Sequence, residues 1–396
     1  MLIRLALILV LTASCTTTPA PALTSVPSAP STLSGQPKPF EAPRWVKLPP
    51  TGVIATGVLQ TVAGWDGGLL LVTDTANEFG VFTSKDGHAW RAAAPKGMIG
   101  LAAGLGRMVA GYGAAGYLLG WTSRGPTVWR TEDGGRWETI PLKLSNLKLE
   151  SRVDLKLTIT AGPRGVMVVG SDNYVPPRYH GVYVWHSPDG RSFNPMTQVP
   201  SRIDKVPPIA VAEATPNGFL MAMSDSNGQM LLSSENGVRW QDITAGLAQI
   251  RGIAHVSGNV STVVVFTYDP LPGASPGEPL AWYRRDGTWH AATMDPGRLP
   301  DAGVVPADER RVNKVGNWGT GFIALGNTLG GDGRETAGLV WYSADGSAWT
   351  RMPVRDNGFD TAAQLMDIAV SRGKAVLVGY PASNSKKPLI WKADVP

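Results

Sequence analysis

Several side chains that could recognise a sugar or an anion lie in long, irregular segments of the 396-residue chain. One segment holds Tyr174, Arg178, Tyr179 and His180, which combine aromatic rings with a planar cation. Such groups suit the recognition of sugars and carboxylates. Further cations in these segments are Arg310, Arg311, Arg334, Lys386 and Lys387. We expect these residues to form a ligand-binding surface, and the alternative is that each is a solvated charge.

A second set of polar residues lies within or beside short apolar runs that are typical of strands. Glu213, Asp367 and His255 are the catalytic candidates of this set, and Lys156 and Lys314 accompany them. Carboxylates and imidazoles can act as general acids and bases. Two carboxylates about 5–10 Å apart beside arginines would indicate glycoside hydrolysis. The alternative is a hydrated channel lining, in which Glu213 and His255 could pair.

Composition excludes several other chemistries. One cysteine allows no internal disulfide and no zinc site built on cysteines. The five histidines lack H-x-x-x-H spacing, and the chain contains neither a Gly-x-Ser-x-Gly motif nor a P-loop. We therefore expect no metal and no cofactor. The formal net charge of +5 is small and scattered, which argues against nucleic acid as a partner.

The first fourteen residues indicate export. Residues 1–4 (MLIR) are basic, and residues 5–12 (LALILVLT) form an apolar segment too short to span a bilayer. Ala13 and Ser14 then precede Cys15. This arrangement resembles the lipobox of bacterial lipoproteins, which implies a signal peptide at 1–14 and lipidation of Cys15. The alternative is an ordinary secretory signal whose cysteine is incidental.

Residues 16–39 contain one charge and consist mainly of Thr, Ser, Pro and Ala. Such a composition cannot bury a core and predicts a flexible spacer. The expected organisation is a signal peptide at 1–14, a lipidated cysteine and linker at 15–39, and one domain at 40–396. We expect an exported, membrane-anchored monomer whose partner is a cell-envelope protein or glycan.

Seven similar segments recur along the rest of the chain, with anchor residues 47 to 59 positions apart. The anchors are Phe82, Trp129, Trp185, Leu232, Trp282, Trp341 and Trp391. In six segments an Asp or Asn lies four residues after the anchor and Gly follows: Asp86, Asp133, Asp189, Asn236, Asp286 and Asp345. The Asx side chain can bond turn amides, and Gly permits a positive φ. Each segment therefore predicts a β-hairpin.

Apolar runs precede every hairpin, so each unit of about 51 residues contains four strands, the size of one propeller blade. We predict an all-β, seven-bladed β-propeller of four-stranded antiparallel blades. The seventh hairpin ends with the chain, and residues 45–49 (WVKLP) have the form of the fourth strand that begins at Trp349. The N-terminal strand is therefore expected to complete the last blade. The alternative is an open solenoid.

The pattern S-x-D-G-x-x-W resembles the Asp-box, or BNR, repeat of sialidases, sortilin-type receptors, tandem-propeller xyloglucanases and photosystem II assembly propellers. The resemblance covers residues 45–396 and implies a fold rather than one function. A non-enzymatic binding or assembly module is the preferred function. A sialidase-like glycoside hydrolase is the alternative, although seven blades rather than six are counted and no Tyr/Glu nucleophile pair can be placed. Glycan binding without turnover lies between the two.

Topology predicts where a site should lie. The Asp-Gly turns are short and uniform, so their face is expected to be scaffold, and most of the tryptophans are expected to pack blades together. The long segments gather on the opposite face, where binding residues usually concentrate.

Overall fold

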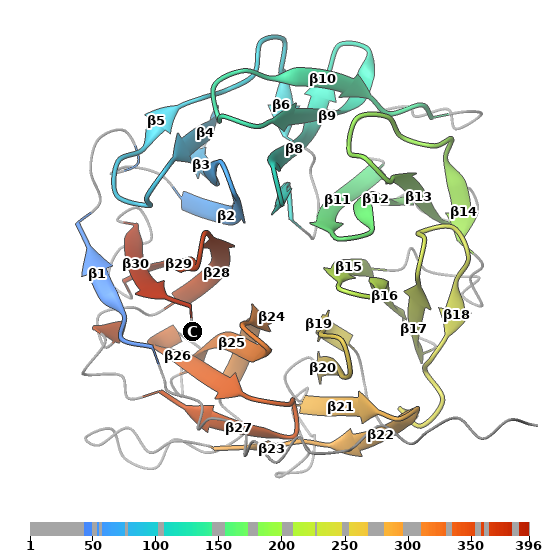
Figure 1. Ribbon diagram of the computed structural model, residues 1–396, viewed down its shortest axis with the longest axis vertical. Coiled ribbons are helices and arrows are strands. Elements are labelled where there is room, and N and C mark those ends of the chain that lie inside the picture. The colour runs from blue at the N-terminus through green and yellow to red at the C-terminus, as the bar shows by residue number, and fades with distance from the viewer. Residues whose placement is uncertain are drawn as a thin grey trace, which may run out of the picture. The chain divides into compact units, whose positions relative to one another are not determined.

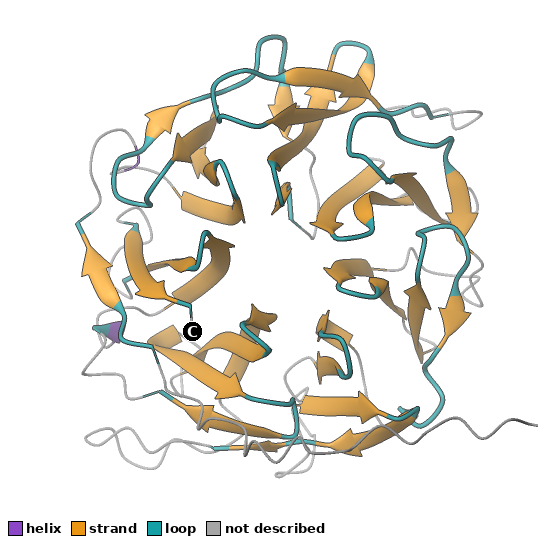
Figure 2. Ribbon diagram, in the orientation of Figure 1, coloured by secondary structure: helices purple, strands orange, loops and turns teal. Residues whose placement is uncertain are grey.

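The computed structural model describes residues 43–395 except for a set of intervening segments. These are 50–53, 55–57, 76–77, 102–106, 145–154, 173–180, 200–208, 226–227, 248–252, 268–280, 296–309, 330–334, 353–357, 360–363 and 382–387. Cys15 and the linker therefore lie outside the described residues. Nearly all the regular structure within them is strand (Figure 2), as the repeats predict. None of their helical turns is long and apolar enough to cross a membrane.

The strands form seven blades in a ring (Figure 1), each with at least four strands. Blade 1 contains β2 (Val58–Trp65), β3 (Gly68–Thr75), β4 (Glu78–Ser84) and β5 (Arg91–Ala92). Blade 2 contains β6 (Gly100–Leu101), β7 (Val109–Tyr112), β8 (Ala115–Thr122), β9 (Gly125–Thr131) and β10 (Glu138–Pro141). Blade 3 contains β11 (Leu155–Gly162), β12 (Gly165–Asp172), β13 (Val182–Ser187) and β14 (Thr197–Val199). Blades 4 and 5 contain β15 (Ile209–Thr215), β16 (Gly218–Asp225), β17 (Gly228–Ser234) and β18 (Gln241–Asp242); and β19 (Ile253–Gly258), β20 (Val263–Thr267), β21 (Ala281–Arg285) and β22 (Thr288–Ala291). Blades 6 and 7 contain β23 (Thr293–Met294), β24 (Arg310–Trp318), β25 (Gly321–Leu329), β26 (Glu335–Ser343) and β27 (Ala348–Arg351); and β28 (Gln364–Ser371), β29 (Lys374–Tyr380), β30 (Leu389–Asp394) and β1 (Val46–Leu48). Neighbouring strands are antiparallel, except that β23 runs parallel to β27.

The innermost strands meet in a closed series. In the order β2, β7, β11, β15, β19, β24 and β28, each contacts the next, and β28 contacts β2. Each blade presents two apolar faces because successive side chains of a strand point to opposite sides. The buried residues accordingly group into seven clusters, one between each pair of adjacent blades. The chain is a seven-bladed β-propeller.

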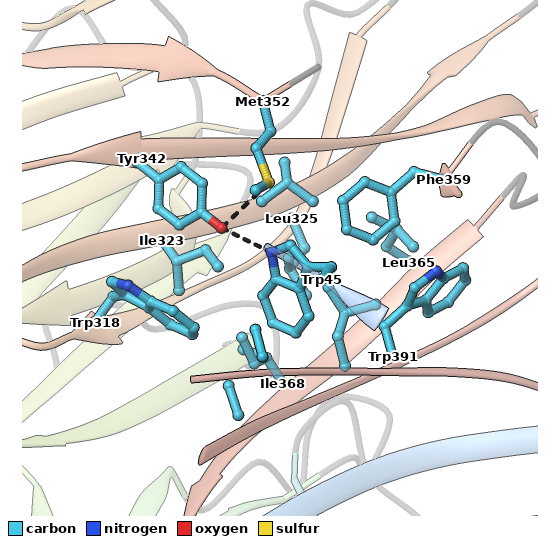
Figure 3. Packing of buried hydrophobic residues seen from close by; sticks show 14 of the residues in the cluster. Trp45, Trp318, Ile323, Leu325, Tyr342, Met352, Phe359, Leu365, Ile368 and Trp391 are labelled. Carbon is cyan, nitrogen blue, oxygen red and sulfur yellow. Dashed lines mark hydrogen bonds between the residues drawn. The ribbon is translucent and has the colours of Figure 1, made fainter. Parts of the chain in front are cut away.

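The N-terminal strand β1 lies beside the C-terminal strand β30 (Figure 1) and pairs antiparallel with it. Trp45, just before β1, is 3% exposed and lies in the cluster between blades 6 and 7 (Figure 3). Its Nε1–H donates to the hydroxyl oxygen of Tyr342 at 2.9 Å, and its ring centroid lies 5.6 Å from that of Trp318. Burial raises the pKa of Tyr342, whose hydroxyl donates to the sulfur of Met352.

Five of the six Asx-Gly turns use the Asx oxygen as the repeats predict. In blade 2, Oδ1 of Asp133 accepts the N–H groups of Gly135 and Arg136 at 2.7 and 2.8 Å. Asp86, Asp189, Asn236 and Asp345 accept corresponding N–H bonds in their own blades. These two N–H bonds stabilise the charged carboxylate and are the main reason that the pKa of Asp133 is lowered.

The sixth turn differs from the prediction. Arg285 pairs with Thr288, so blade 5 has a two-residue turn made of Asp286 and Gly287, with φ of 49° and 82°. Two successive positive φ values define a type I′ hairpin. The reason lies in the sequence, because one residue fewer separates this Gly from the following tryptophan, Trp289. Asp286 is therefore a hairpin residue, and among the described residues its side chain accepts none of the turn N–H bonds seen in the other five.

Replacing Trp45 tests its contribution to the interface between blades 6 and 7. Trp45→Ala is expected to lower the free energy of unfolding by about 3–5 kcal/mol, because it removes a large buried ring and leaves a cavity. Denaturant unfolding followed by tryptophan fluorescence measures the change. The matched control is Val46→Ala on the same segment, where the side chain is 56% exposed and little change is expected. Equal unfolding midpoints for the two variants would contradict the packing role of Trp45.

Candidate functional site

The innermost strands carry polar side chains toward the axis of the ring. In blades 1, 5, 6 and 7 the pairing of the innermost strand shifts register, and it resumes at Thr61, His255, Lys314 and Asp367. An extra residue in one strand re-aims the side chains around it. The same irregularity thus sets an equivalent polar position in four blades.

Blade 2 positions a further cation by a larger interruption. Its strands β6 and β7 pair with β8 on either side of Leu119, whose N–H donates to the carbonyl of Met108 at 2.8 Å. Arg107 precedes Met108 and therefore has no place in the register of β8. Its carbonyl instead accepts the N–H of Ile159 in blade 3 at 3.0 Å.

Four charged side chains, Arg107, Glu213, Lys314 and Asp367, form what we call the axial cluster. They come from blades 2, 4, 6 and 7, and residues of non-adjacent blades can meet only across the axis. Nη1 of Arg107 lies 3.1 Å from Oε1 of Glu213, and Nη2 lies 3.8 Å from Oδ1 of Asp367. Nζ of Lys314 lies 3.8 Å from Oε2 of Glu213. These ion pairs join blade 2 to blades 4 and 7, and blade 6 to blade 4.

Hydrogen bonds from three backbone or side-chain donors hold Asp367 in place. Its Oδ2 accepts from the hydroxyl of Thr61 at 2.8 Å and from the N–H of Val62 at 3.0 Å, both in blade 1. Its Oδ1 accepts the N–H of Ile368 at 2.9 Å. The side chain of Asp367 is 5% exposed. A buried carboxylate requires such partners, because desolvation of an unpaired charge is costly.

The net effect of burial and neighbouring charges lowers the pKa of Lys314 and raises the pKa of Arg107. Burial lowers the pKa of Lys314, and the charge of Arg107 lowers it further against the effect of Glu213 and Asp367. Burial also disfavours charged Arg107, but the two carboxylates outweigh it and raise its pKa. Arg107 is therefore the permanent cation of the cluster, and Lys314 is its titratable member.

The axial cluster is internally balanced, with two cations and two carboxylates. Both oxygens of Glu213 face cations, and both oxygens of Asp367 accept protein hydrogen bonds. Through these contacts the cluster connects blades 2, 4, 6 and 7. The cluster also brings two carboxylates to one guanidinium, the arrangement that the sequence analysis associated with glycoside hydrolysis. Within the described part of the chain, no group of three or more His, Cys, Asp or Glu residues could hold a metal.

The axial candidates of the sequence analysis can be compared with these contacts. Glu213 and Asp367 come together through Arg107, which the sequence analysis missed. The hydrogen bond seen for His255 joins its Nε2 to the carbonyl of Val312 at 3.1 Å, in the neighbouring blade. The signal for Arg107 was the glycine-rich stretch 103–106 before it, which interrupts the strand pattern.

The candidates on the long segments mostly lie outside the described residues. These are Tyr174, Arg178, Tyr179, His180, Arg334, Lys386 and Lys387. Arg310 and Arg311 begin β24, but their side chains are not among those described. The predicted ligand-binding surface therefore stays a prediction.

No family model and no curated protein matches the chain. Among solved structures it is similar to the Pyrococcus horikoshii acylaminoacyl peptidase, with 7% identity and a TM-score of 0.48 over 82% of this chain. The chain spans about half (49%) of the length of that peptidase. The β-propeller domain of the Trilobed protease from Pyrococcus furiosus is similar at 9% identity and a TM-score of 0.48, covering 85% of this chain and 93% of the other. The N11 neuraminidase-like protein of A/flat-faced bat/Peru/033/2010 is similar at 7% identity and a TM-score of 0.44, covering 89% and 94%. At these identities no residue role carries over.

Removing the guanidinium of the axial cluster should destabilise the ring. Arg107→Met is expected to lower the free energy of unfolding by roughly 3 kcal/mol, because it leaves Glu213 and Asp367 short of a partner in a largely buried site. Denaturant unfolding measures the loss. Arg124→Met, in the exposed β8–β9 turn, is the control and should change stability by less than about 0.5 kcal/mol. An effect of Arg107→Met no larger than that of the control would show that the cluster is not a crosslink.

The lowered pKa of Lys314 predicts a pH dependence with a definite sign. Between that pKa and the ordinary value of 10.5, the unfolded chain binds one more proton at this group than the native chain. The contribution of Lys314 to stability therefore rises with pH across this window. Unfolding free energies of the wild type and of Lys314→Met, measured in parallel from neutral pH to about 10.5, should diverge in favour of the wild type as pH rises. A difference independent of pH would contradict the shift.

Proposed function

We propose that the chain is a non-enzymatic binding or assembly propeller, exported and tethered to a membrane by lipid on Cys15. The carrying observation is the internal pairing of the axial cluster, in which Glu213 and Asp367 bond protein donors instead of facing open space. A propeller without displayed catalytic groups still offers a rigid frame for binding residues. The proposed partner is a cell-envelope protein or glycan.

The anchoring is supported by the sequence before the propeller. A basic start, a short apolar segment and Ala13-Ser14-Cys15 agree with a lipoprotein signal, and the Thr/Ser/Pro linker would hold the propeller away from the bilayer. The Asp-box resemblance is supported by the bonding of the five turns described above. It agrees with binding proteins as well as with hydrolases.

Replacing Cys15 tests the tether. In cells supplied with radiolabelled palmitate, the wild-type chain should carry label and sediment with membranes, whereas Cys15→Ser should lose both properties. Thr16→Ala, one residue later, is the matched control and should behave as the wild type. Label that persists in Cys15→Ser would exclude the lipid anchor on Cys15.

A glycoside hydrolase is the second candidate, favoured by the meeting of Glu213 and Asp367 at Arg107. A panel of chromogenic glycosides separates the two functions. The proposed function predicts no turnover by the purified full chain and enrichment of a specific partner from solubilised membranes. Turnover that is lost in both Glu213→Gln and Asp367→Asn would establish the hydrolase instead.

A further inference from the structure

The Asx-Gly turns also serve as contacts between blades. A Cβ atom added to the turn glycine would meet the preceding blade in all five turns that bond as predicted, including Gly190, where it would meet the side chain of Tyr117. The other contacts are Gly87 with Val376 at 2.6 Å, Gly134 with Thr83 at 3.1 Å, Gly237 with His186 at 2.9 Å, and Gly346 with Val264 at 2.6 Å. Each such turn therefore packs closely against the blade before it, at a position that we call the socket of that blade.

The two-residue turn of blade 5 leaves its socket unfilled. A Cβ atom on Gly287 would come within 4 Å only of Arg284, in its own hairpin, at 3.8 Å. The socket on blade 4 centres on Ser233, which pairs with Leu220 as Thr83 pairs with Leu70 in blade 1. A groove of about 510 Å³ lies there, between blades 4 and 5, and Ser233, Leu220 and Arg284 line it. It lies on the face that the sequence analysis expected to be scaffold.

The indole of Trp240 in this groove lacks the bond that holds two of its counterparts. Trp90 and Trp349 each donate Nε1–H to the carbonyl of their turn glycine at 3.0 Å. Nε1 of Trp240 is buried and has no hydrogen-bond partner among the described residues. The half-buried ring forms part of the groove wall together with the apolar side chains of Leu220 and Ile243.

Two guanidinium groups line the same groove without a compensating carboxylate. Neither Arg239 nor Arg284 forms an ion pair with a described residue, although Glu235 lies in the same lining. Guanidinium groups bind carboxylates by paired, charge-assisted hydrogen bonds. The carboxylate of Glu235 is exposed and can accept hydrogen bonds from hydroxyl or amide donors. A ligand with one carboxylate, several hydroxyls and an apolar ring face complements the two guanidinium groups, Glu235 and the ring of Trp240.

We propose that the groove between blades 4 and 5 binds an acidic saccharide. Arg239 and Arg284 hold its carboxylate, Glu235 accepts from its hydroxyls, and its ring lies against Trp240. The volume falls within the range of small-ligand sites, roughly 300–1,000 Å³. This inference rests on the proposed binding function and names its ligand class.

The test is a calorimetric titration of the full chain in mild detergent with trigalacturonate and with sialyllactose. Galactotriose and lactose are the neutral counterparts. We expect saturable binding of an acidic saccharide and none of the neutral ones. Arg239→Met and Arg284→Met should each weaken binding at least about tenfold, as loss of one charge-assisted contact predicts. Ser233→Tyr should abolish it by filling the socket, since blade 5 carries Tyr283 at the corresponding position.

Arg136→Met is the matched control, because Arg136 also precedes the tryptophan that follows its turn, but Gly134 of that turn packs against Thr83, the counterpart of Ser233 in blade 1. Circular dichroism and the unfolding midpoint verify that each variant folds. Absence of saturable binding, equal binding of neutral saccharides, or full binding by Ser233→Tyr would overturn the proposal. So would an acidic peptide that binds in place of the saccharides. Glycoside turnover would overturn the non-enzymatic function and leave the groove proposal intact, so the two failures are distinguishable.

Discussion

Each blade of this propeller has two apolar faces, and only a closed ring buries both of them. A four-stranded sheet standing alone would expose both of its apolar faces and both of its edges. Seven interfaces, each with its own buried cluster, solve this problem. No blade can be removed without exposing the faces of two neighbours, so the ring is the unit of stability. The pairing of β1 with β30 gives the last blade its fourth strand from the opposite end of the chain.

Ring closure brings polar groups together at the axis, where charge must be compensated. The innermost strands converge there, and side chains from blades that are far apart in sequence become neighbours. Arg107 and Asp367 are 260 residues apart in the chain, yet they form an ion pair. Such pairs contribute modestly to net stability, since desolvation offsets attraction, but removal of one partner is costly. The intact cluster therefore adds little net stability, whereas loss of one member leaves a buried charge without its partner.

Two departures from the repeat create the axial cluster and the groove between blades 4 and 5. Blade 2 interrupts its innermost strand and so places Arg107 at the axis. Blade 5 shortens its Asx-Gly turn and so leaves a groove on blade 4. Repeat proteins tend to depart from their regular turn and strand patterns at functional sites, because selection for ligand binding competes there with selection for packing. Both departures are visible as changes in spacing around otherwise similar segments.

The sequence by itself determined the strand order, the number of blades and the role of most anchor tryptophans. Each of these follows from local periodicity and turn chemistry, as the bonds of Asp133 and the burial of Trp129 and Trp185 show. Only the tertiary structure decided which charges meet. Glu213 shares a guanidinium with Asp367, and a vacant socket adjoins Ser233, because ring geometry and the fit of one turn against the next blade set these neighbours. The spacing of residue types along the chain determines local strands and turns. Contacts across the axis depend instead on how all seven blades are arranged in the ring.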